Sequence, residues 1–140
     1  MPTAVIDLTE MVRMAMQGPK RSLLFKAWES RAFVWITSEK IVAEFIEVAH
    51  RPKLQRMIRP LVLDAVVEAI RINSRFVTPA AKFPPCRDPK DNIIIATAVA
   101  AQSDFIVTSD NDMLDDEALS LALSEYHIRA ILPSEFLDLL

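Results

Sequence analysis

The chain has 140 residues, of which 51% are hydrophobic and 25% are charged, and its formal net charge is −3. This length suits a single core, so we expect residues 1–140 to form one domain. The net charge argues against a nucleic-acid binder held by general basicity alone, although the clustered acids of a nuclease would also make the chain more acidic.

Several classes of site are excluded by residues that are rare in this chain. Cys86 is the only cysteine, which rules out an intramolecular disulfide and a Cys-rich zinc site and suits a reducing cytoplasm. Gly18 is the only glycine, which rules out glycine-rich nucleotide-binding loops. No signal-peptide pattern and no apolar run of membrane-spanning length is present, so we expect a cytoplasmic protein without a membrane partner.

Short β-rich runs alternate with amphipathic stretches along the whole chain. The predicted strands are 3–6, 33–36, 75–78, 104–108 and 128–132. The predicted helices are 8–16, 20–30, 39–50, 60–73, 89–100 and 134–139, with a helical turn at 53–57 and a short acidic helix containing Leu114 and Leu119. Because the connections are long enough for crossovers, we predict an α/β domain with three layers, α/β/α, around a parallel sheet of about five short strands.

Carboxylates lie where the predicted strands give way to helices. Asp7 follows the first strand and Asp110 follows the fourth, while Asp91 lies in the first turn of a helix and Glu44 lies beside the apolar stripe of another. Loops at the carboxyl ends of parallel strands meet in one crevice, where acids repel one another unless a cation lies between them. The sequence therefore indicates a divalent-metal site, and a site made only of oxygen ligands favours Mg²⁺ or Mn²⁺.

Each acid taken alone also has a purely structural explanation. Asp7 and Asp88 are suited to cap helices, Asp91 to interact with a helix dipole, and Asp110 and Asp112 to form Asx turns. These structural explanations account for each acid taken singly. The presence of Asp at three separate strand-to-helix junctions is what favours a shared site.

Four segments resemble the conserved motifs of PIN-domain proteins. They are Ile6-Asp7, 37–53 from Thr37-Ser38 through Glu44 to Arg51-Pro52-Lys53, 86–98 with Cys86-Arg87-Asp88-Pro89-Lys90-Asp91, and 106–112 with Thr108-Ser109-Asp110-Asn111-Asp112. The resemblance covers nearly the whole chain and is strongest to the toxin components of toxin–antitoxin systems. It implies a metal-dependent ribonuclease that hydrolyses single-stranded RNA.

The resemblance also assigns residues and partners. The implied catalytic residues are Asp7, Glu44, Asp91 and Asp110, with Asp112 as a further metal ligand and with Thr9, Asp88 and Arg87 as accessory residues. The implied cofactor is Mg²⁺ or Mn²⁺, and Arg87 beside the acids is the best candidate for an RNA phosphate contact. The implied partners are RNA and a small antitoxin, and we expect a homodimer. Met16, Leu23 and neighbouring apolar residues suit the core or, if exposed, a partner surface.

Two alternatives remain open from the sequence. The family usually has Asp-Thr-Asn in its first motif, whereas this chain has Asp7-Leu8-Thr9, and polar groups beside metal ligands affect affinity and activity. The chain is therefore also suited to be a catalytically impaired PIN-like domain that binds RNA or protein. An aspartyl-phosphate receiver or phosphatase also gathers acids at strand ends, but it needs a lysine near them, and no lysine follows a strand in the required place.

Overall fold

One parallel sheet crosses the whole molecule. The computed structural model describes residues 1–140 and contains five strands: β1 (Thr3–Ile6), β2 (Val34–Thr37), β3 (Arg75–Phe76), β4 (Phe105–Val107) and β5 (Arg129–Ile131). All pairs are parallel, and the order is β3-β2-β1-β4-β5. The first strand in the chain is thus the central strand of the sheet.

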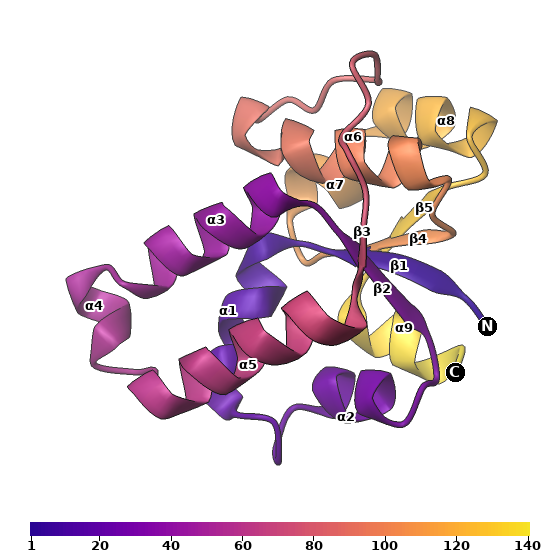
Figure 1. Cartoon of the computed structure of the whole chain (residues 1–140). Coiled ribbons are helices and arrows are strands. Elements are labelled where there is room, and N and C mark those ends of the chain that lie inside the picture. The colour runs from indigo at the N-terminus through magenta and orange to yellow at the C-terminus, as the bar shows by residue number, and fades with distance from the viewer.

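Helices cover both faces of this sheet. They are α1 (Leu8–Gln17), α2 (Leu23–Glu29), α3 (Glu39–Ala49), α4 (Pro52–Gln55), α5 (Pro60–Asn73), α6 (Asn92–Ala101), α7 (Asn111–Leu114), α8 (Glu117–Glu125) and α9 (Pro133–Asp138), with the 3₁₀ helix η1 (Pro89–Asp91) before α6. In Figure 1, α6, α7 and α8 lie above the sheet and α1, α2, α5 and α9 lie below it. The predicted three-layer α/β fold with about five parallel strands is confirmed.

The central strand is apolar on both faces because helices pack on both sides of it. Ala4, Val5 and Ile6 are completely buried, and Val5 pairs with Ile36 of β2 and Ile106 of β4. Continuous apolar runs of this kind are typical of parallel strands. This rigid centre fixes the point from which the chain leaves β1 and β4.

Several element boundaries differ from the sequence prediction, and three of the differences have a clear local cause. Helix α2 begins at Leu23 rather than at residue 20, because the Ser22 hydroxyl accepts a hydrogen bond from Phe25 N and caps the helix there. Strand β3 ends at Phe76, shortly before Pro79. The acidic helix is two helices, since Asp116 caps a new one by accepting from Leu119 N.

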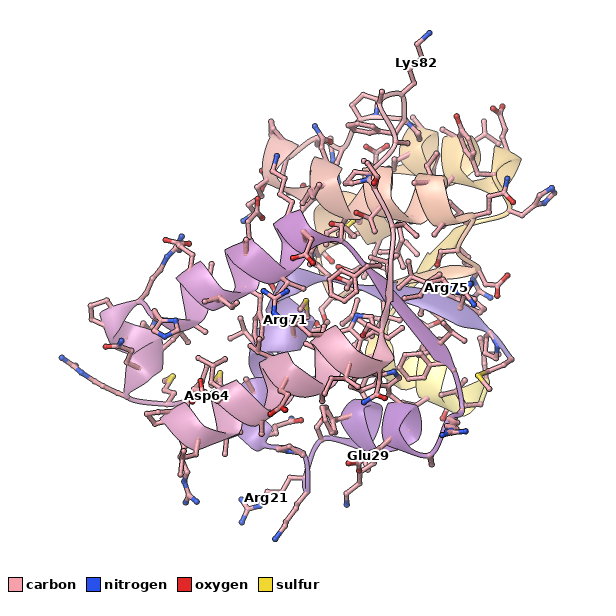
Figure 2. The ribbon with its side chains drawn as sticks, in the orientation of Figure 1. Arg21, Glu29, Asp64, Arg71, Arg75 and Lys82 are labelled. Carbon is pink, nitrogen blue, oxygen red and sulfur yellow. The ribbon has the colours of Figure 1, made fainter.

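Most charged side chains are exposed to solvent across the molecule, whereas most of the apolar residues considered for a partner surface are buried. The charged side chains labelled in Figure 2 are all exposed: Arg21, Glu29, Asp64, Arg71, Arg75 and Lys82. Among the apolar residues considered for a partner surface, Met11, Met14, Leu24 and Trp28 are buried, whereas Met16 is 41% and Leu23 is 66% exposed. No helix combines the length and the apolar character needed to span a bilayer.

Candidate metal centre

The candidate site lies where the direction of chain winding reverses. β1 and β4 are neighbours, and the chain leaves β1 toward β2 but leaves β4 toward β5. In open α/β sheets, ligands bind in the crevice that such a reversal creates at the carboxyl ends of the strands. Asp7 comes directly after β1, and Asp110 comes directly before α7 in the loop that follows β4.

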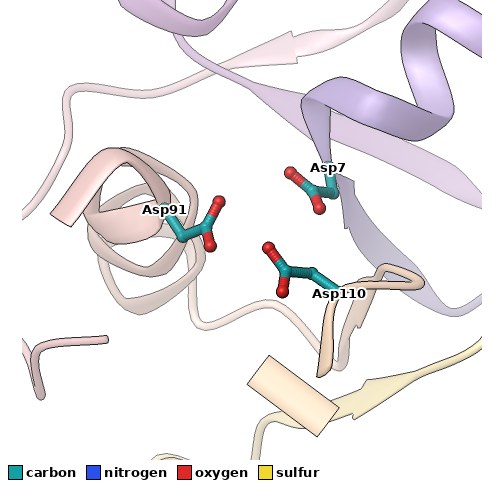
Figure 3. A group of neighbouring side chains, drawn as sticks. All are labelled: Asp7, Asp91 and Asp110. Carbon is teal, nitrogen blue, oxygen red and sulfur yellow. The ribbon is translucent and has the colours of Figure 1, made fainter. Parts of the chain in front are cut away.

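Three aspartates from distant parts of the chain meet in this crevice. Asp7, Asp91 and Asp110 each offer a carboxylate oxygen within 4.8 Å of the others. Asp7 and Asp91 are 3% and 5% exposed, and Asp110 is half-buried. Figure 3 shows the three side chains pointing toward one another, with Asp91 approaching from the opposite side to Asp7. The prediction that these acids lie close together in the folded structure is confirmed.

Local hydrogen bonds hold the Asp7 carboxylate in place. Its Oδ1 accepts from Leu8 N at 2.7 Å, and its Oδ2 accepts from the Thr108 hydroxyl at 2.8 Å. The backbone N–H of Asp7 also donates to Val107 O at 2.9 Å. Asp7 therefore caps α1, as its structural explanation required, and each oxygen still has a lone pair directed elsewhere.

The Thr108 hydroxyl connects two of the three aspartates. It donates to Asp7 and accepts from the backbone N–H of Asp110 at 3.0 Å. Asp110 in turn accepts from Asp112 N through Oδ1 at 2.9 Å, which forms the expected Asx turn and caps α7. Asp110 thus has a structural role as well as a place in the acidic group.

Asp91 shows the clearest departure from a structural role. Although it occupies the N-cap position of α6, its side chain makes no capping hydrogen bond. Burial raises its pKa to about 7, with further contributions from a hydrogen bond with Asp110 and the charge of Asp7. Burial also raises the pKa of Asp7, against the opposing effect of its hydrogen bond from Thr108. Without a bound cation, full ionisation of the three aspartates is therefore unfavourable.

The donor set fits a hard divalent cation. Mg²⁺ takes six oxygen ligands at about 2.1 Å, so its ligand oxygens lie about 3 to 4 Å apart. Small side-chain rotations bring a group within 4.8 Å to that spacing. Because all ligand atoms are oxygens, they suit Mg²⁺ or Mn²⁺ rather than zinc. The structure therefore shows an acidic group that fits a metal ion, and the choice between the two metals remains a prediction.

A cavity of about 550 Å³ opens beside this group. Its lining includes Asp7, Asp91 and Asp110, together with Glu44 and Thr9, two further predicted site residues. Glu44 is half-buried on α3 and Thr9 is exposed at the start of α1. Neither residue belongs to the three-aspartate group, so Glu44 faces the same space as the acids without joining their cluster.

The other predicted site residues belong to a second acidic group that shares Asp91. Asp88 and Asp112 form a second group with Asp91, again within 4.8 Å. Lys90 pairs with Asp88 at 3.4 Å, and Arg87 pairs with Asp112 at 3.5 Å. This second group is therefore partly neutralised by its own cations.

The Arg87 side chain joins two loops. Besides its pair with Asp112, its Nε lies 3.7 Å from Asp116 and its Nη2 donates to Asn111 O at 3.2 Å. These contacts connect the segment before α6 to helix α7. The sequence assigned Arg87 to RNA phosphates, and the contacts made in the structure indicate that it also organises the site.

Three residues of the site were missed by sequence reasoning. Thr108, Glu10 and Ser109 contact Asp7 or one another at the start of α1 and the end of β4. The signal for Glu10 was a carboxylate in the first turn of a predicted helix, directly before Met11 of its apolar face. Thr108 and Ser109 were visible only as part of a motif, without an assigned role.

A protein-family model matches most of the chain. Residues 3–112 match the family model described as PIN domain, which includes all three converging aspartates. No curated protein matches the chain.

Proposed function

Because the chain belongs to the PIN-domain family, whose members are typically nucleases, we propose that it is a divalent-metal-dependent endoribonuclease acting on single-stranded RNA. The observation that carries this proposal is the convergence of Asp7, Asp91 and Asp110 on one edge of the sheet. Such a site needs no side-chain nucleophile. The family match also argues against the aspartyl-phosphate receiver.

The three aspartates would hold the metal ion. When bound, Mg²⁺ or Mn²⁺ supplies activation of water and stabilisation of the charge on a phosphodiester. Asp7 is orientated for binding by Thr108, and Asp91 has no competing hydrogen bond from the helix that it begins. Glu44 lines the cavity beside them and would orient a water or a ribose hydroxyl. Asp112 and Asp88 flank Asp91 and would contribute through water.

The toxin role is a further part of the proposal. It is supported by the sequence motifs and predicts a small antitoxin encoded next to this chain. Met16 and Leu23 are exposed and suit a protein partner or a second copy in a homodimer. This role, together with the single cysteine, predicts a cytoplasmic protein. Growth arrest on expression, reversed by co-expression of the neighbouring gene product, is the expected result.

An impaired, RNA-binding domain is the second candidate function. It is favoured by the first motif, in which Leu8 is apolar and Thr9 is exposed rather than bonded to an acid. Against it, the Thr108 hydroxyl supplies Asp7 with a fixed polar partner at 2.8 Å. RNA binding without any metal-dependent cleavage would favour this second candidate.

Cleavage of single-stranded RNA in the presence of Mn²⁺ tests the proposal. We expect cleavage by the natural chain and none by the Asp7→Asn or Asp91→Asn variant, since each removes a ligand charge from the group. The Asp64→Asn variant is the matched control, because Asp64 is exposed on α5 and lines a different cavity. Cleavage that persists unchanged in both site variants, or that ignores chelation of the metal, refutes this mechanism.

A further inference from the structure

A fourth carboxylate is buried beside the acidic group. Glu10 lies in the first turn of α1 and is 4% exposed. It does not belong to either three-acid group. Charged residues are almost never this buried unless they are paired.

Glu10 is held in a three-membered hydrogen-bond network. Arg13 Nη1 donates to Glu10 Oε1 at 3.0 Å and to the Ser109 hydroxyl at 3.1 Å. The Ser109 hydroxyl in turn donates to the same Glu10 oxygen in a short hydrogen bond. The network therefore joins helix α1 to the loop after β4, across a separation of 99 residues in the chain.

Stability alone does not explain an acid in this place. A buried ion pair is often no better for stability than apolar residues of similar size. The neighbouring Met11 and Met14 on α1 are buried apolar residues, so an apolar side chain suits this side of the helix. The distinguishing feature of Glu10 is its partner, since Ser109 lies between Thr108 and Asp110.

We propose that Glu10, with Arg13, is a positioning residue that fixes the Thr108-Ser109-Asp110 segment and so holds the Asp110 carboxylate toward Asp7 and Asp91. Thr108 is anchored to Asp7, and Glu10 anchors the next residue. With two successive side chains anchored, the backbone at Asp110 has little freedom to turn away from the centre. The consequence for metal affinity rests on the proposed function, whereas the ordering of the segment does not.

Glu10 also adds a negative charge near Asp7, where it is one of the causes that raise the pKa of Asp7. Two variants separate charge from positioning. Glu10→Gln removes the charge but keeps an oxygen that accepts from Ser109 and Arg13, whereas Glu10→Leu removes both. Glu39→Leu is the matched control, because Glu39 forms an exposed ion pair with Arg71 at 3.1 Å away from the site.

Hydrogen exchange of the metal-free protein measures the positioning role directly. The amides of Asp110 and Asp112 are bonded to Thr108 and to Asp110 side chains and report the order of the segment. In Glu10→Leu we expect these amides to exchange about tenfold faster, the factor that corresponds to one lost hydrogen bond. Glu10→Gln and Glu39→Leu should exchange as the natural chain does, and β1 amides should be unchanged in all variants.

Mn²⁺ affinity, measured by electron paramagnetic resonance, is the second readout. We expect Glu10→Leu to weaken binding by about 10-fold or more, the range for groups that orient metal ligands, and Glu10→Gln to weaken it less. Unchanged exchange in Glu10→Leu, or equal acceleration in Glu10→Gln, overturns the positioning role. If Glu10→Leu does not fold, Ser109→Ala removes the other end of the link and must give the same acceleration. Accelerated exchange in a chain that never binds Mn²⁺ supports the positioning role and refutes the proposed function.

Discussion

The Asp91 carboxyl group makes a quantitative prediction for the metal-free protein. Its pKa is raised from 3.8 to about 7 by burial, by the hydrogen bond with Asp110 and by the charge of Asp7. The folded chain therefore holds this proton more tightly than the unfolded chain does. Below about pH 4 the carboxyl group is protonated in both states and has no effect on the free energy of unfolding. As the pH rises from about 4 to 7, only the unfolded chain readily loses this proton, so the free energy of unfolding falls. Above that range it stays reduced.

Replacing Asp91 by Asn removes this penalty because the side chain stays neutral at every pH. One pKa unit corresponds to about 1.4 kcal/mol. Because the acids line an open cavity, we expect solvent screening to leave less than half of the full value, about 1 to 2 kcal/mol at pH 8. The Asp91→Asn variant should then melt about 3 to 8 °C higher than the natural chain at pH 8 in the presence of a chelator.

Thermal unfolding at two pH values checks this reasoning. The difference between the two proteins should shrink as the pH falls toward 4, where Asp91 of the natural chain is also protonated. Adding Mn²⁺ at pH 8 should stabilise the natural chain and leave the variant nearly unchanged, since a ligand stabilises only a fold that binds it. A variant that is no more stable at pH 8, or equally stabilised at both pH values, refutes the argument.

Three further substitutions test other parts of the site. Thr108→Val keeps the shape of a buried side chain but removes the hydroxyl that donates to Asp7, so Mn²⁺ affinity should fall about 10-fold while the sheet stays folded. Unchanged affinity contradicts the role given to this hydroxyl. Arg87→Gln should lower stability by only about 0.5 kcal/mol because its ion pairs are half-exposed. Because Arg87 is also the candidate phosphate contact, the variant should bind a non-cleavable RNA more weakly and with a smaller salt dependence, and unchanged affinity contradicts that contact. Glu44→Gln should slow RNA cleavage about 10-fold or more with little change in Mn²⁺ affinity, and a parallel loss of affinity would place Glu44 among the direct ligands.

The architecture could be predicted because local signals agree with the global fold. Apolar runs such as Ala4 to Ile6 marked buried strands, and Pro60 and Pro133 marked the first residues of α5 and α9. Boundaries were less accurate where capping decides them, as at Ser22 and Asp116. In both places a side-chain hydrogen bond starts a helix at a residue that apolar spacing alone does not select.

The acidic group could be predicted for a different reason. Asp7 and Asp110 follow neighbouring parallel strands, so the topology brings them together whatever their exact side-chain angles. Glu10 and Ser109 could not be paired in this way, because 99 residues separate them and only the packing of α1 decides which of its side chains meets the loop. The partners of Arg87 depend on tertiary packing in the same way.

The three aspartates are far apart in the sequence although they meet in the folded structure, and this has a consequence for synthesis. The crevice needs β1 beside β4, and β4 becomes an interior strand only when β5 pairs with it near the end of the chain. A ribosome-bound chain that has exposed only its first hundred residues carries Asp7 and Asp91 but lacks Asp110 and the strand that holds it. Such long-range pairings form late, so the three aspartates come together only after β4 and β5 have both left the ribosome.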